Sequence, residues 1–196
     1  MLTYNGNSYE TIKGETYYEA VNRLGIKGAL AVQNGGQPLS LNTPAGRDAE
    51  VLTIANEEGR RIYERSLRMV TLLACERLYP GAKLRFENSF GHGILITAKG
   101  IALDEQTVRA LENEMHKIAD EKLPFEVSLY SKEEAEEYYA SKGMDDKIAV
   151  LKYRKNDFIH LYECGGMKEY FYGEMAHDTG DVSVFALVCV PGGMVL

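Results

Sequence analysis

A long amphipathic stretch at residues 56–81, "NEEGRRIYERSLRMVTLLACERLYPG", most constrains what this chain can fold into. Asn56 followed by two glutamates suits the start of a helix, because carboxylates are favoured at the positive end of the helix dipole. Pro80 and Gly81 end the pattern. One apolar stripe at helical spacing runs along it, formed by Ile62, Met69, Leu72, Leu73 and Leu78. The stretch therefore predicts one long helix with a single apolar face.

The first 55 residues are predicted to form a small unit of strands around one helix. "LTYNGNSYETI" holds two short β-prone runs around an Asn-Gly-Asn turn at residues 5–7. A short helix follows, with Thr16 as its N-cap and Gly25 as its stop. Two strands joined by a Gly-Gly turn and a last strand in "AEVLTI" close the unit. This is the element order of a ubiquitin-like β-grasp module, which by itself indicates a fold and no function.

Beyond the long helix, strands and helices mix, so the sequence predicts an α+β fold. The helix expected at residues 104–123 has one clear apolar face, made of Val108, Leu111, Met115 and Ile118. A further helix is expected at 131–143, with Ser131 at its start. Strands are expected in residues 83–100 (a pair), 125–131, 147–153, 158–166 and 182–190.

Length and composition bound the class of protein. At 196 residues the chain can form one large domain or two small ones. No apolar run approaches the roughly 20 residues that cross a bilayer, and the N-terminus lacks the regions of a signal peptide. Cys75, Cys164 and Cys189 are odd in number and widely spaced, which argues against a disulfide framework. We therefore expect a reduced, cytoplasmic protein with no membrane partner.

The charge balance bears on partners. The net charge is −7, whereas nucleic-acid binders usually carry a basic face that neutralises phosphates. Lys152, Arg154 and Lys155 form the best local basic segment, which is more often a solvated loop than a binding patch. RNA binding is disfavoured by this balance, although a local basic strip is compatible with it.

Two stretches carry a resemblance to a known family. Residues 51–86, "VLTIANEEGRRIYERSLRMVTLLACERLYPGAKLRF", resemble the passage in threonyl-tRNA synthetases where the N-terminal β-grasp (TGS) domain meets the editing domain. Residues 108–127, "VRALENEMHKIADEKLPFEV", continue the resemblance into the editing domain's helix. The resemblance implies a TGS-like domain at residues 1–55 and an editing-type α/β domain at residues 56–196.

The tail is similar to a different group of proteins. The Tyr-Phe-Tyr-Gly run at residues 170–173, the pair Thr179 and Gly180, and the closing Pro-Gly resemble bacterial uridine-kinase-like proteins, which carry both modules ahead of a P-loop kinase domain. The sequence contains no G-x-x-x-x-G-K-[ST] motif, so this chain has no P-loop for nucleotide phosphates. The resemblance implies an N-terminal region whose C-terminal partner is a nucleoside kinase domain. ATP and Mg²⁺ would belong to that domain, and no cofactor is expected in this chain.

The editing chemistry of the synthetases is predicted to be lost. Their sites use an H-x-x-x-H pair on the first helix and a C-x-x-x-H pair near the end of the domain. The resemblance puts Arg65 and Met69 at the first pair, and Cys164 and Lys168 at the second. Charged arginine and lysine offer no lone pair, a thioether is a poor zinc ligand, and none of them replaces a histidine general base. No catalytic residue and no metal ligand is therefore assigned.

The changed positions leave two alternatives open. If Arg65, Met69, Cys164 and Lys168 converge, two cations face one cavity and would bind a carboxylate or a phosphate. Alternatively, Met69 fills the old pocket and both cations reach solvent. His92, between two glycines, either lines this cleft or sits in a simple turn.

The histidines near Cys164 carry a separate metal hypothesis. His160 and Cys164 are four apart in an expected strand and so share a face. A lone thiol among apolar residues is more often a small buried hydrophobe, and His177 follows with no second ligand pair. We expect no metal here.

Together these patterns favour a non-catalytic N-terminal region of a uridine- or nucleoside-kinase-like protein. It would bind a nucleoside, a nucleotide or another anionic ligand, or regulate the kinase. One alternative is a free-standing hydrolase of mischarged tRNA (trans-editing) with chemistry rebuilt around Cys164 and His177. Another is an RNA-binding module that uses the β-grasp face.

Overall fold

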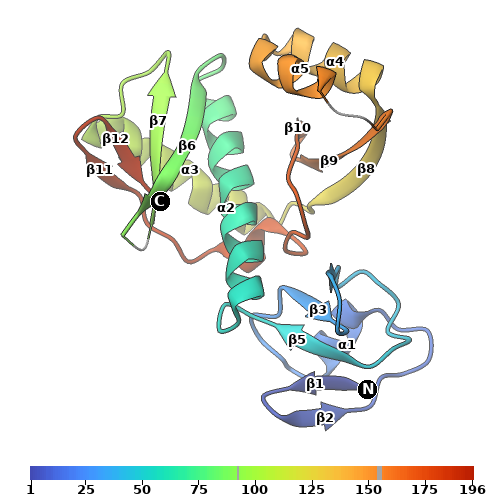
Figure 1. Ribbon diagram of the computed structural model, residues 1–196. Coiled ribbons are helices and arrows are strands. Elements are labelled where there is room, and N and C mark those ends of the chain that lie inside the picture. Colours follow the sequence, from blue (N-terminus) through green and yellow to red (C-terminus); the bar gives the residue numbers. More distant parts are fainter. Residues whose placement is uncertain (92, 154–155) are drawn as a thin grey trace. The chain divides into compact units, whose positions relative to one another are not determined.

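The structure of the chain, a computed structural model, describes residues 1–91, 93–153 and 156–196. It confirms the predicted α+β class, with helices and three separate sheets among these residues (Figure 1). The chain divides into two compact units. Unit 1 contains residues 1–125 together with 172–196, and unit 2 contains residues 126–171. The predicted domain boundary between residues 55 and 56 falls inside unit 1 and stays a prediction.

Unit 1 begins with a five-stranded sheet that packs against one helix. Its elements are β1 (Leu2–Tyr4), β2 (Asn7–Tyr9), α1 (Tyr17–Arg23), β3 (Ala31–Gln33), β4 (Pro38–Leu39) and β5 (Ala49–Leu52). The strand order is β2-β1-β5-β3-β4, and the β1–β5 pair is parallel. The turn between β1 and β2 needs positive φ at both Asn5 (50°) and Gly6 (77°), which explains the Asn-Gly signal. This sheet and α1 have their own hydrophobic core, which includes the buried side chains of Leu2, Tyr17 and Val32.

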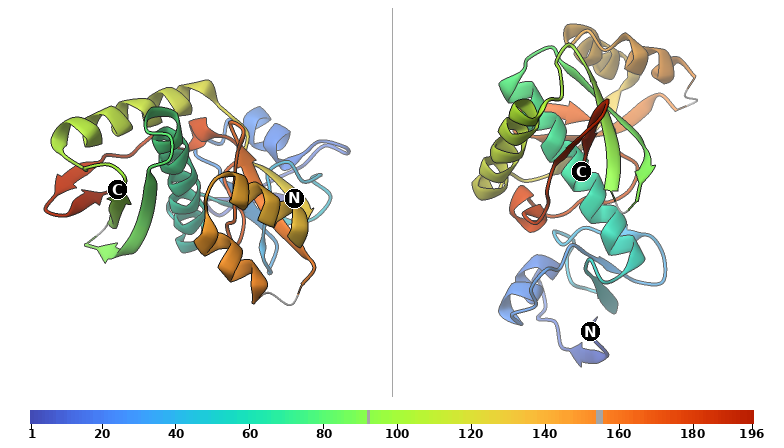
Figure 2. Two further views of the ribbon diagram at one scale, coloured as in Figure 1. Left: turned by 90° about the horizontal axis from the view of Figure 1, so that it is seen from above. Right: turned by 90° about the vertical axis from the view of Figure 1, so that its left-hand side faces the viewer.

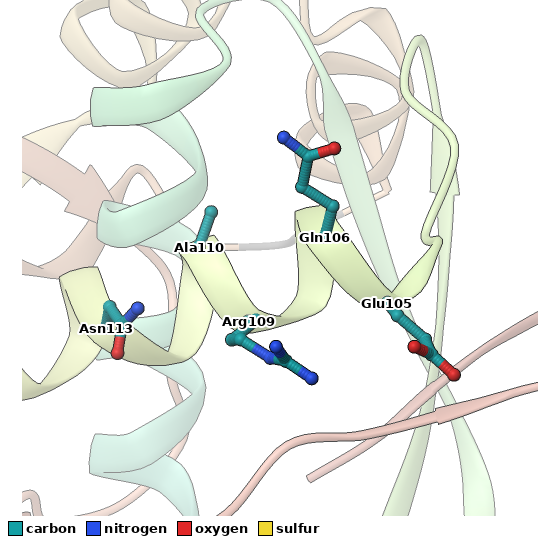
Figure 3. A pocket seen from close by; sticks show the side chains of 5 residues that line it. All are labelled: Glu105, Gln106, Arg109, Ala110 and Asn113. Carbon is teal, nitrogen blue, oxygen red and sulfur yellow. The ribbon is translucent and has the colours of Figure 1, made fainter.

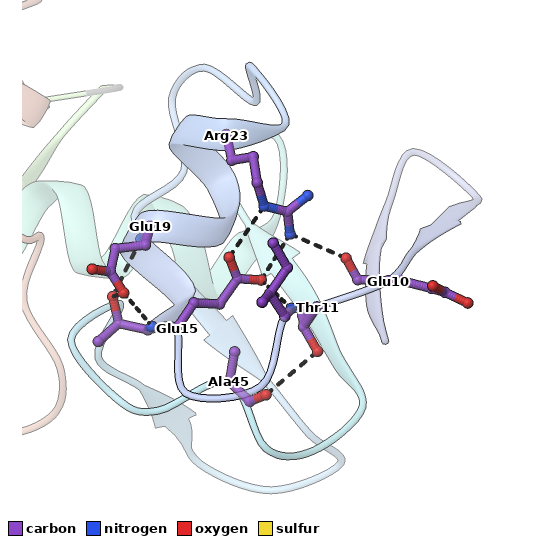
Figure 4. A network of polar contacts seen from close by, with 8 residues as sticks. Glu10, Thr11, Glu15, Glu19, Arg23 and Ala45 are labelled. Carbon is purple, nitrogen blue, oxygen red and sulfur yellow. Dashed lines mark hydrogen bonds and ion pairs between the residues drawn. The ribbon is translucent and has the colours of Figure 1, made fainter.

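Side-chain hydrogen bonds fix the ends of α1 (Figure 4). Thr16 accepts from the Glu19 amide at 3.2 Å, and the Glu19 carboxylate accepts from the Thr16 amide at 2.7 Å, which is a capping box. The Arg23 guanidinium donates to both carboxylate oxygens of Glu15, at 2.7 and 3.1 Å, and to the Glu10 carbonyl. The hydrogen bonds from Arg23 lower the pKa of Glu15. The predicted N-cap is thus confirmed, and the helix gains a second anchor at its C-terminal end.

The predicted long helix is α2 (Glu57–Leu78), and the connection that starts it is tight. The Thr53 amide donates to Asn56 Oδ1 at 2.8 Å, and the Asn56 amide donates to the Thr53 carbonyl at 3.0 Å. A Cβ on Gly59 would lie 1.9 Å from the Thr53 carbonyl oxygen, so only glycine fits there. Of the predicted stripe, Ile62, Met69 and Leu73 are buried, whereas Leu78, the last residue of the helix, is 37% exposed.

A four-stranded antiparallel sheet covers α2 and the following helix α3 (Glu105–Glu121) (Figures 1 and 2). Its strands, in the order β11-β12-β7-β6, are β6 (Lys83–Phe90), β7 (Gly93–Lys99), β11 (Val188–Val190) and β12 (Gly193–Val195). Ile96 and Met194 lie on the buried face, and all four predicted apolar positions of α3 are buried. Arg77 joins the two helices through Glu121 at 2.7 Å and Glu114 at 3.3 Å.

The predicted strand at 182–190 is mostly wrong. A 3₁₀ turn, η1 (Thr179–Val182), precedes a segment without regular secondary structure, and of the residues predicted as this strand Val188–Val190 pair as one. Val184 is 83% exposed, so the apolar run is not a continuous buried strand. The apolar side chains of this run do not pack together as one strand face. Phe185, for example, stacks on His116 of α3, with 4.4 Å between the ring centroids.

Unit 2 is a three-stranded antiparallel sheet with two helices on one face. Its elements are β8 (Glu126–Ser131), α4 (Lys132–Ser141), α5 (Asp145–Lys152), β9 (Phe158–Cys164) and β10 (Met167–Glu169), with strand order β10-β9-β8. Ser131 caps α4 through a capping box with Glu134, as its sequence predicts. Ala135, Tyr139 and Leu151 from the helices pack on Ile159 and Leu161 of β9.

The strand predicted at residues 147–153 is wrong, because this segment belongs to α5. Ile148 and Leu151, three positions apart, both pack into the core of unit 2. Val150, which strand alternation would place with Ile148, is 60% exposed. The helical period therefore overrides the apparent alternation.

Within the described residues Cys75, Cys164 and Cys189 form no disulfide, and Cys75 and Cys164 are buried. Burial raises the pKa of the Cys75 thiol to about 11. No helix within the described ranges is both long enough and apolar enough to cross a membrane.

Candidate ligand site

Arg65, the first of the predicted site residues, is held by the chain segment that returns from unit 2. Its guanidinium Nη1 donates to the Glu174 carbonyl. It also packs against Gly173, where an added Cβ would lie 3.0 Å from Nη2. Gly173 has a φ of 95°, which an L side chain rarely adopts. Arg65 therefore binds a backbone oxygen and covers a glycine.

Ser66, the next residue, ties the same segment to α2. Its buried hydroxyl accepts a hydrogen bond from the Ala176 amide at 2.9 Å and donates to the Ile62 carbonyl at 2.9 Å. Together Arg65 and Ser66 clamp residues 173–176 along one side of the helix. This contact was not predicted from the sequence, where Ser66 appears as one polar residue of the amphipathic stretch.

Met69 lies one turn further along α2 and is fully buried. Its thioether has no access to solvent. The side chain fills interior volume, for which methionine is well suited because it is flexible. This burial agrees with the alternative in which Met69 fills the space that a ligand would need.

Cys164 and Lys168 lie in unit 2, on opposite faces of its sheet. In the β9–β10 pair Cys164 is opposite Met167 and Lys168 is opposite Glu163. Directly opposed residues share a face, and neighbours along a strand do not. The Lys168 ammonium therefore lies on the side of Glu163, 3.9 Å from its carboxylate, and the Cys164 thiol points to the other side.

Aromatic rings surround the Lys168 ammonium. Its Nζ lies 4.6 Å from the centroid of the Tyr130 ring and 5.6 Å from that of Tyr138. A hydrogen bond to Tyr130 raises the pKa of Lys168. The Lys168 amide also donates to the Tyr138 hydroxyl at 2.8 Å. Lys168 is thus a protonated cation within an aromatic setting.

The predicted site residues are therefore brought together only in part. Arg65 and Met69 share one side of α2 in unit 1, while Cys164 and Lys168 belong to unit 2 and face apart. His92 lies outside the described residues, as do Arg154 and Lys155 of the predicted basic segment. The pocket predicted from all five site residues stays a prediction.

A buried carboxylate in unit 2 was not predicted. Glu169 is 5% exposed, and its Oε1 accepts from Lys147 Nζ at 2.9 Å, from the Tyr170 amide at 2.8 Å and from the Tyr139 hydroxyl at 3.5 Å. Burial, and then the nearby negative charge of Glu169, raise the pKa of Tyr139. The arrangement joins α4 and α5 to β10, which is a structural role.

The histidines of the metal hypothesis do not gather other ligands. His160 is on the same face of β9 as Cys164, as predicted from the alternation. His177 stacks on Tyr18, with 3.8 Å between ring centroids, and its buried Nδ1 has no hydrogen-bond partner among the described residues. Within the described part of the chain, no three His, Cys, Asp or Glu side chains come together as metal ligands.

The surface of α3 carries a shallow open hollow (Figure 3). Its lining residues all come from this one helix: Glu105, Gln106, Arg109, Ala110 and Asn113. It combines one cation, one carboxylate and two amides, and no second element of the described ranges lines it. A ligand here would stay largely in solvent, which is unlike the usual enclosed binding site.

Comparison with known proteins returns threonine–tRNA ligases. No model of a known protein family matches the chain. The chain is 29% identical over 198 residues to the threonine–tRNA ligase of Symbiobacterium thermophilum, which covers 96% of this chain and 30% of that protein. The corresponding enzyme of Oleidesulfovibrio alaskensis is 29% identical over 181 residues, covering 89% of this chain and 28% of that protein. That of Thermotoga maritima is 28% identical over 196 residues, covering 96% and 30%.

The chain thus spans less than a third of the length of these relatives. The similarity to threonyl-tRNA synthetases, first indicated by residues 51–86 and 108–127, is confirmed over nearly the whole chain. It agrees with a synthetase-type editing module. These relatives give no support to the nucleoside-kinase context.

Proposed function

We propose that this chain is a synthetase-type editing module that no longer hydrolyses its ligand and instead binds it, the ligand being the nucleotide-containing end of an RNA or a related nucleotide. The observation that carries the proposal is that Arg65 and Met69, on one face of α2, are both engaged in contacts within the protein. Arg65 is bound to the backbone of residues 173–174, and Met69 is fully buried. Neither side chain can act as the histidine that the family resemblance places there.

Loss of the general base follows from the same residues. Hydrolysis of an ester needs a group that accepts a proton near neutral pH. The pKa of Lys168 is raised by its hydrogen bond to Tyr130, so this amine stays protonated and cannot accept one. An arginine guanidinium is charged throughout the ordinary pH range. Binding without turnover is what remains for such a set of groups.

The ligand class follows from the relatives. They are named threonine–tRNA ligases, so a tRNA or its nucleotide end is the first ligand to test. The predicted nucleoside-kinase context rests on the tail alone: residues 170–173, 179 and 180, and the closing Pro-Gly at 191–192. Extending the source gene's sequence past the codon for Leu196 would test it: a reading frame that enters a G-x-x-x-x-G-K-[ST] motif supports a kinase, and one that enters synthetase catalytic sequence contradicts it.

The deciding experiment measures release and binding together. Transfer RNA carrying a radiolabelled amino acid is incubated with the chain, and free amino acid is counted against a buffer control. We expect no release above buffer, and retention of the charged tRNA on a filter in proportion to added protein.

Release that disappears in Cys164→Ser or in His177→Ala would contradict the proposal. It would establish the alternative of a free-standing hydrolase. Absence of both release and retention would also overturn the proposal, because the chain would then neither hydrolyse nor bind this ligand.

A further inference from the structure

The three-stranded sheet of unit 2 ends in a regular edge strand, β8. In the order β10-β9-β8, its strand partner within the described ranges is β9, on one side only (Figure 1). All six residues of β8 keep one register with β9, from Glu126 opposite Glu163 to Ser131 opposite Phe158. The outer side of such a strand presents backbone N–H and C=O groups that can hydrogen-bond a further strand.

The other edge strands of the described residues carry features that oppose such pairing. β2, β10 and β11 have three residues each, and β4 has two, one of them a proline. β6 is longer, but its register shifts between Phe86 and Ser89. It also displays the charged side chains of Lys83 and Arg85. Short length, proline, irregular register and charge are the means by which proteins protect sheet edges, and β8 has only a single charge, Glu126, at its first position.

The side of this edge that faces away from α4 and α5 is apolar and exposed. Ile159 of β9 packs against those helices, so strand alternation puts Phe158 and His160 on the opposite face. Leu129 is opposite His160, and Val127 lies two positions before Leu129 on the same face. The apolar side chains of Val127, Leu129 and Phe158 are 49%, 56% and 58% exposed. A group of neighbouring exposed apolar side chains marks an interaction surface.

The strand that fits this edge is a second copy of β8. Directly opposed residues of an antiparallel pair share a face, so two copies of "EVSLYS" match when a two-fold axis passes through Ser128. Val127 of each copy then lies opposite Leu129 of the other, and the two apolar surfaces become one. The edge is therefore complementary to itself in both its backbone and its side chains.

The charges of β8 agree with the same register. Glu126 and Lys168 both lie on the helix-covered face, since each is opposite Glu163 in its own strand pair. With the axis at Ser128, Glu126 of one copy is opposite Tyr130 of the other. The Lys168 ammonium lies 4.6 Å from the centroid of the Tyr130 ring, so the carboxylate meets a site beside a cation. Like charges directly opposed across strands destabilise pairing, and this register opposes none.

We propose that two copies of this chain associate through antiparallel pairing of their β8 strands about Ser128, which joins two three-stranded sheets into one. The contact is isologous, because the same surface of each copy is used. Two short strands bury a small area compared with a stable interface, so the dimer is weak and its population depends on concentration. The proposal goes beyond the proposed function and does not depend on it.

The first test measures molar mass by equilibrium sedimentation over a range of concentrations. Wild type should rise from the mass of one chain toward that of two. In Val127→Lys/Leu129→Lys each new lysine lies opposite a lysine of the second copy, so association should weaken at least ~10-fold. Val150→Lys/Val184→Lys is the matched control, because it adds the same charge at two exposed valines outside β8. It should associate like wild type.

The second test fixes the register with cysteine substitutions under mild oxidation. Ser128→Cys places two thiols opposite each other across the axis, within the span of a disulfide, and should give a covalent dimer. In Val127→Cys the two thiols are offset by two positions along the strands. Their Cα atoms are then roughly 8 Å apart, beyond the reach of a disulfide, so this control should stay uncrosslinked. Wild type measures any background from the native cysteines.

Each result has one meaning. A mass of one chain at every concentration up to about 1 mM overturns the proposal, because even a weak specific interface forms by then. An equal effect of the two lysine variants, or no effect of either, places the contact elsewhere and also overturns it. So does a covalent dimer from Val127→Cys in place of Ser128→Cys. Circular dichroism checks the fold of each variant, and if the β8 lysine variant is unfolded, the two cysteine variants decide. None of these results alters the release and retention of charged tRNA by which the proposed function is judged.

Discussion

Single polar side chains hold the returning segment 173–182 in place. The Ser66 hydroxyl accepts from the Ala176 amide, and the Thr179 hydroxyl donates to the Ile118 carbonyl at 2.6 Å while accepting from the Leu123 amide at 2.9 Å. Both hydroxyls are fully buried. A buried amide that loses its acceptor costs free energy, because water cannot replace the bond. The position of this segment therefore depends on two hydroxyls.

Replacing Ser66 with alanine should lower the free energy of unfolding by about 1–3 kcal/mol, since the Ala176 amide would be left buried and unsatisfied. Chemical denaturation measures the change. Thr71→Val is the matched control, because the buried Thr71 hydroxyl donates to the Leu67 carbonyl of its own helix. Similar losses in both variants would show that the Ala176 contact contributes nothing particular.

The Asp181 carboxyl makes stability depend on pH. Burial raises its pKa, and the nearby Asp178 raises it further. Between the unfolded pKa, about 3.9, and the higher folded pKa, the folded state keeps a proton that the unfolded state has lost. Stability contributed by this group therefore falls as pH rises through that window.

Asp181→Asn removes this titration and can still accept from the Asp178 amide, as Asp181 does at 3.4 Å. We expect the two proteins to be closest in stability at the acidic end, and the variant to become the more stable of the two as pH rises through the window. Unfolding curves across that range measure the difference, with Asp157→Asn as an exposed control. A difference that does not vary with pH would contradict the argument.

At the scale of helices and strands, local signals predicted most elements. The capped helices α1 and α4, the long α2 and the amphipathic α3 follow from their N-caps and apolar stripes. The misses share a cause: α5 and the segment before β11 are short apolar runs, in which periods of 2 and 3.6 cannot be told apart. Their structure is decided by packing on other elements.

The start of α2 depends on one glycine. Gly59→Ala would place a methyl group 1.9 Å from the Thr53 carbonyl oxygen, a backbone atom that cannot move without disturbing β5 or the turn. Overpacking of this kind destabilises by about 1–3 kcal/mol, and more where backbone must shift. Thermal unfolding should show a clear fall in melting temperature. Gly46→Ala, where an added Cβ meets nothing within 4 Å, should leave it near the wild-type value.

At the scale of the whole molecule, the candidate site was the least predictable part. Arg65 and Glu174 are 109 positions apart, and Ser66 and Ala176 are 110 apart. Contacts at such separations leave no periodic trace in a sequence, so the resemblance could name Arg65 but could not show what it binds. Strand register, which placed Cys164 and Lys168 on opposite faces, likewise depends on a turn whose geometry the sequence only suggests.

The chain leaves and re-enters unit 1 at neighbouring points. The Phe125 amide donates to the His177 carbonyl at 3.3 Å, and Pro124 bridges to Asp178. Replacing residues 126–171 with a short Gly-Ser linker should therefore leave unit 1 folded, because its sheets and helices have their own cores. Circular dichroism and a cooperative thermal transition check this. A shortened chain that unfolds without cooperativity would show that unit 1 needs unit 2.

The close approach of Gly59 to Thr53 also fixes the rotational phase of α2. Each residue turns an α-helix by about 100°, so moving the glycine by one position would turn every later side chain by that angle about the axis. The residues that clamp the segment 173–176 lie six and seven positions beyond Gly59. Inserting or deleting one residue between Gly59 and Arg65 would rotate Arg65 and Ser66 away from segment 173–176. Other side chains of α2 would then face that segment, even though the inserted or deleted residue itself does not contact it. The residue types at the positions of α2 that face segment 173–176 can therefore change without altering which positions face it, provided that their spacing from Gly59 stays the same.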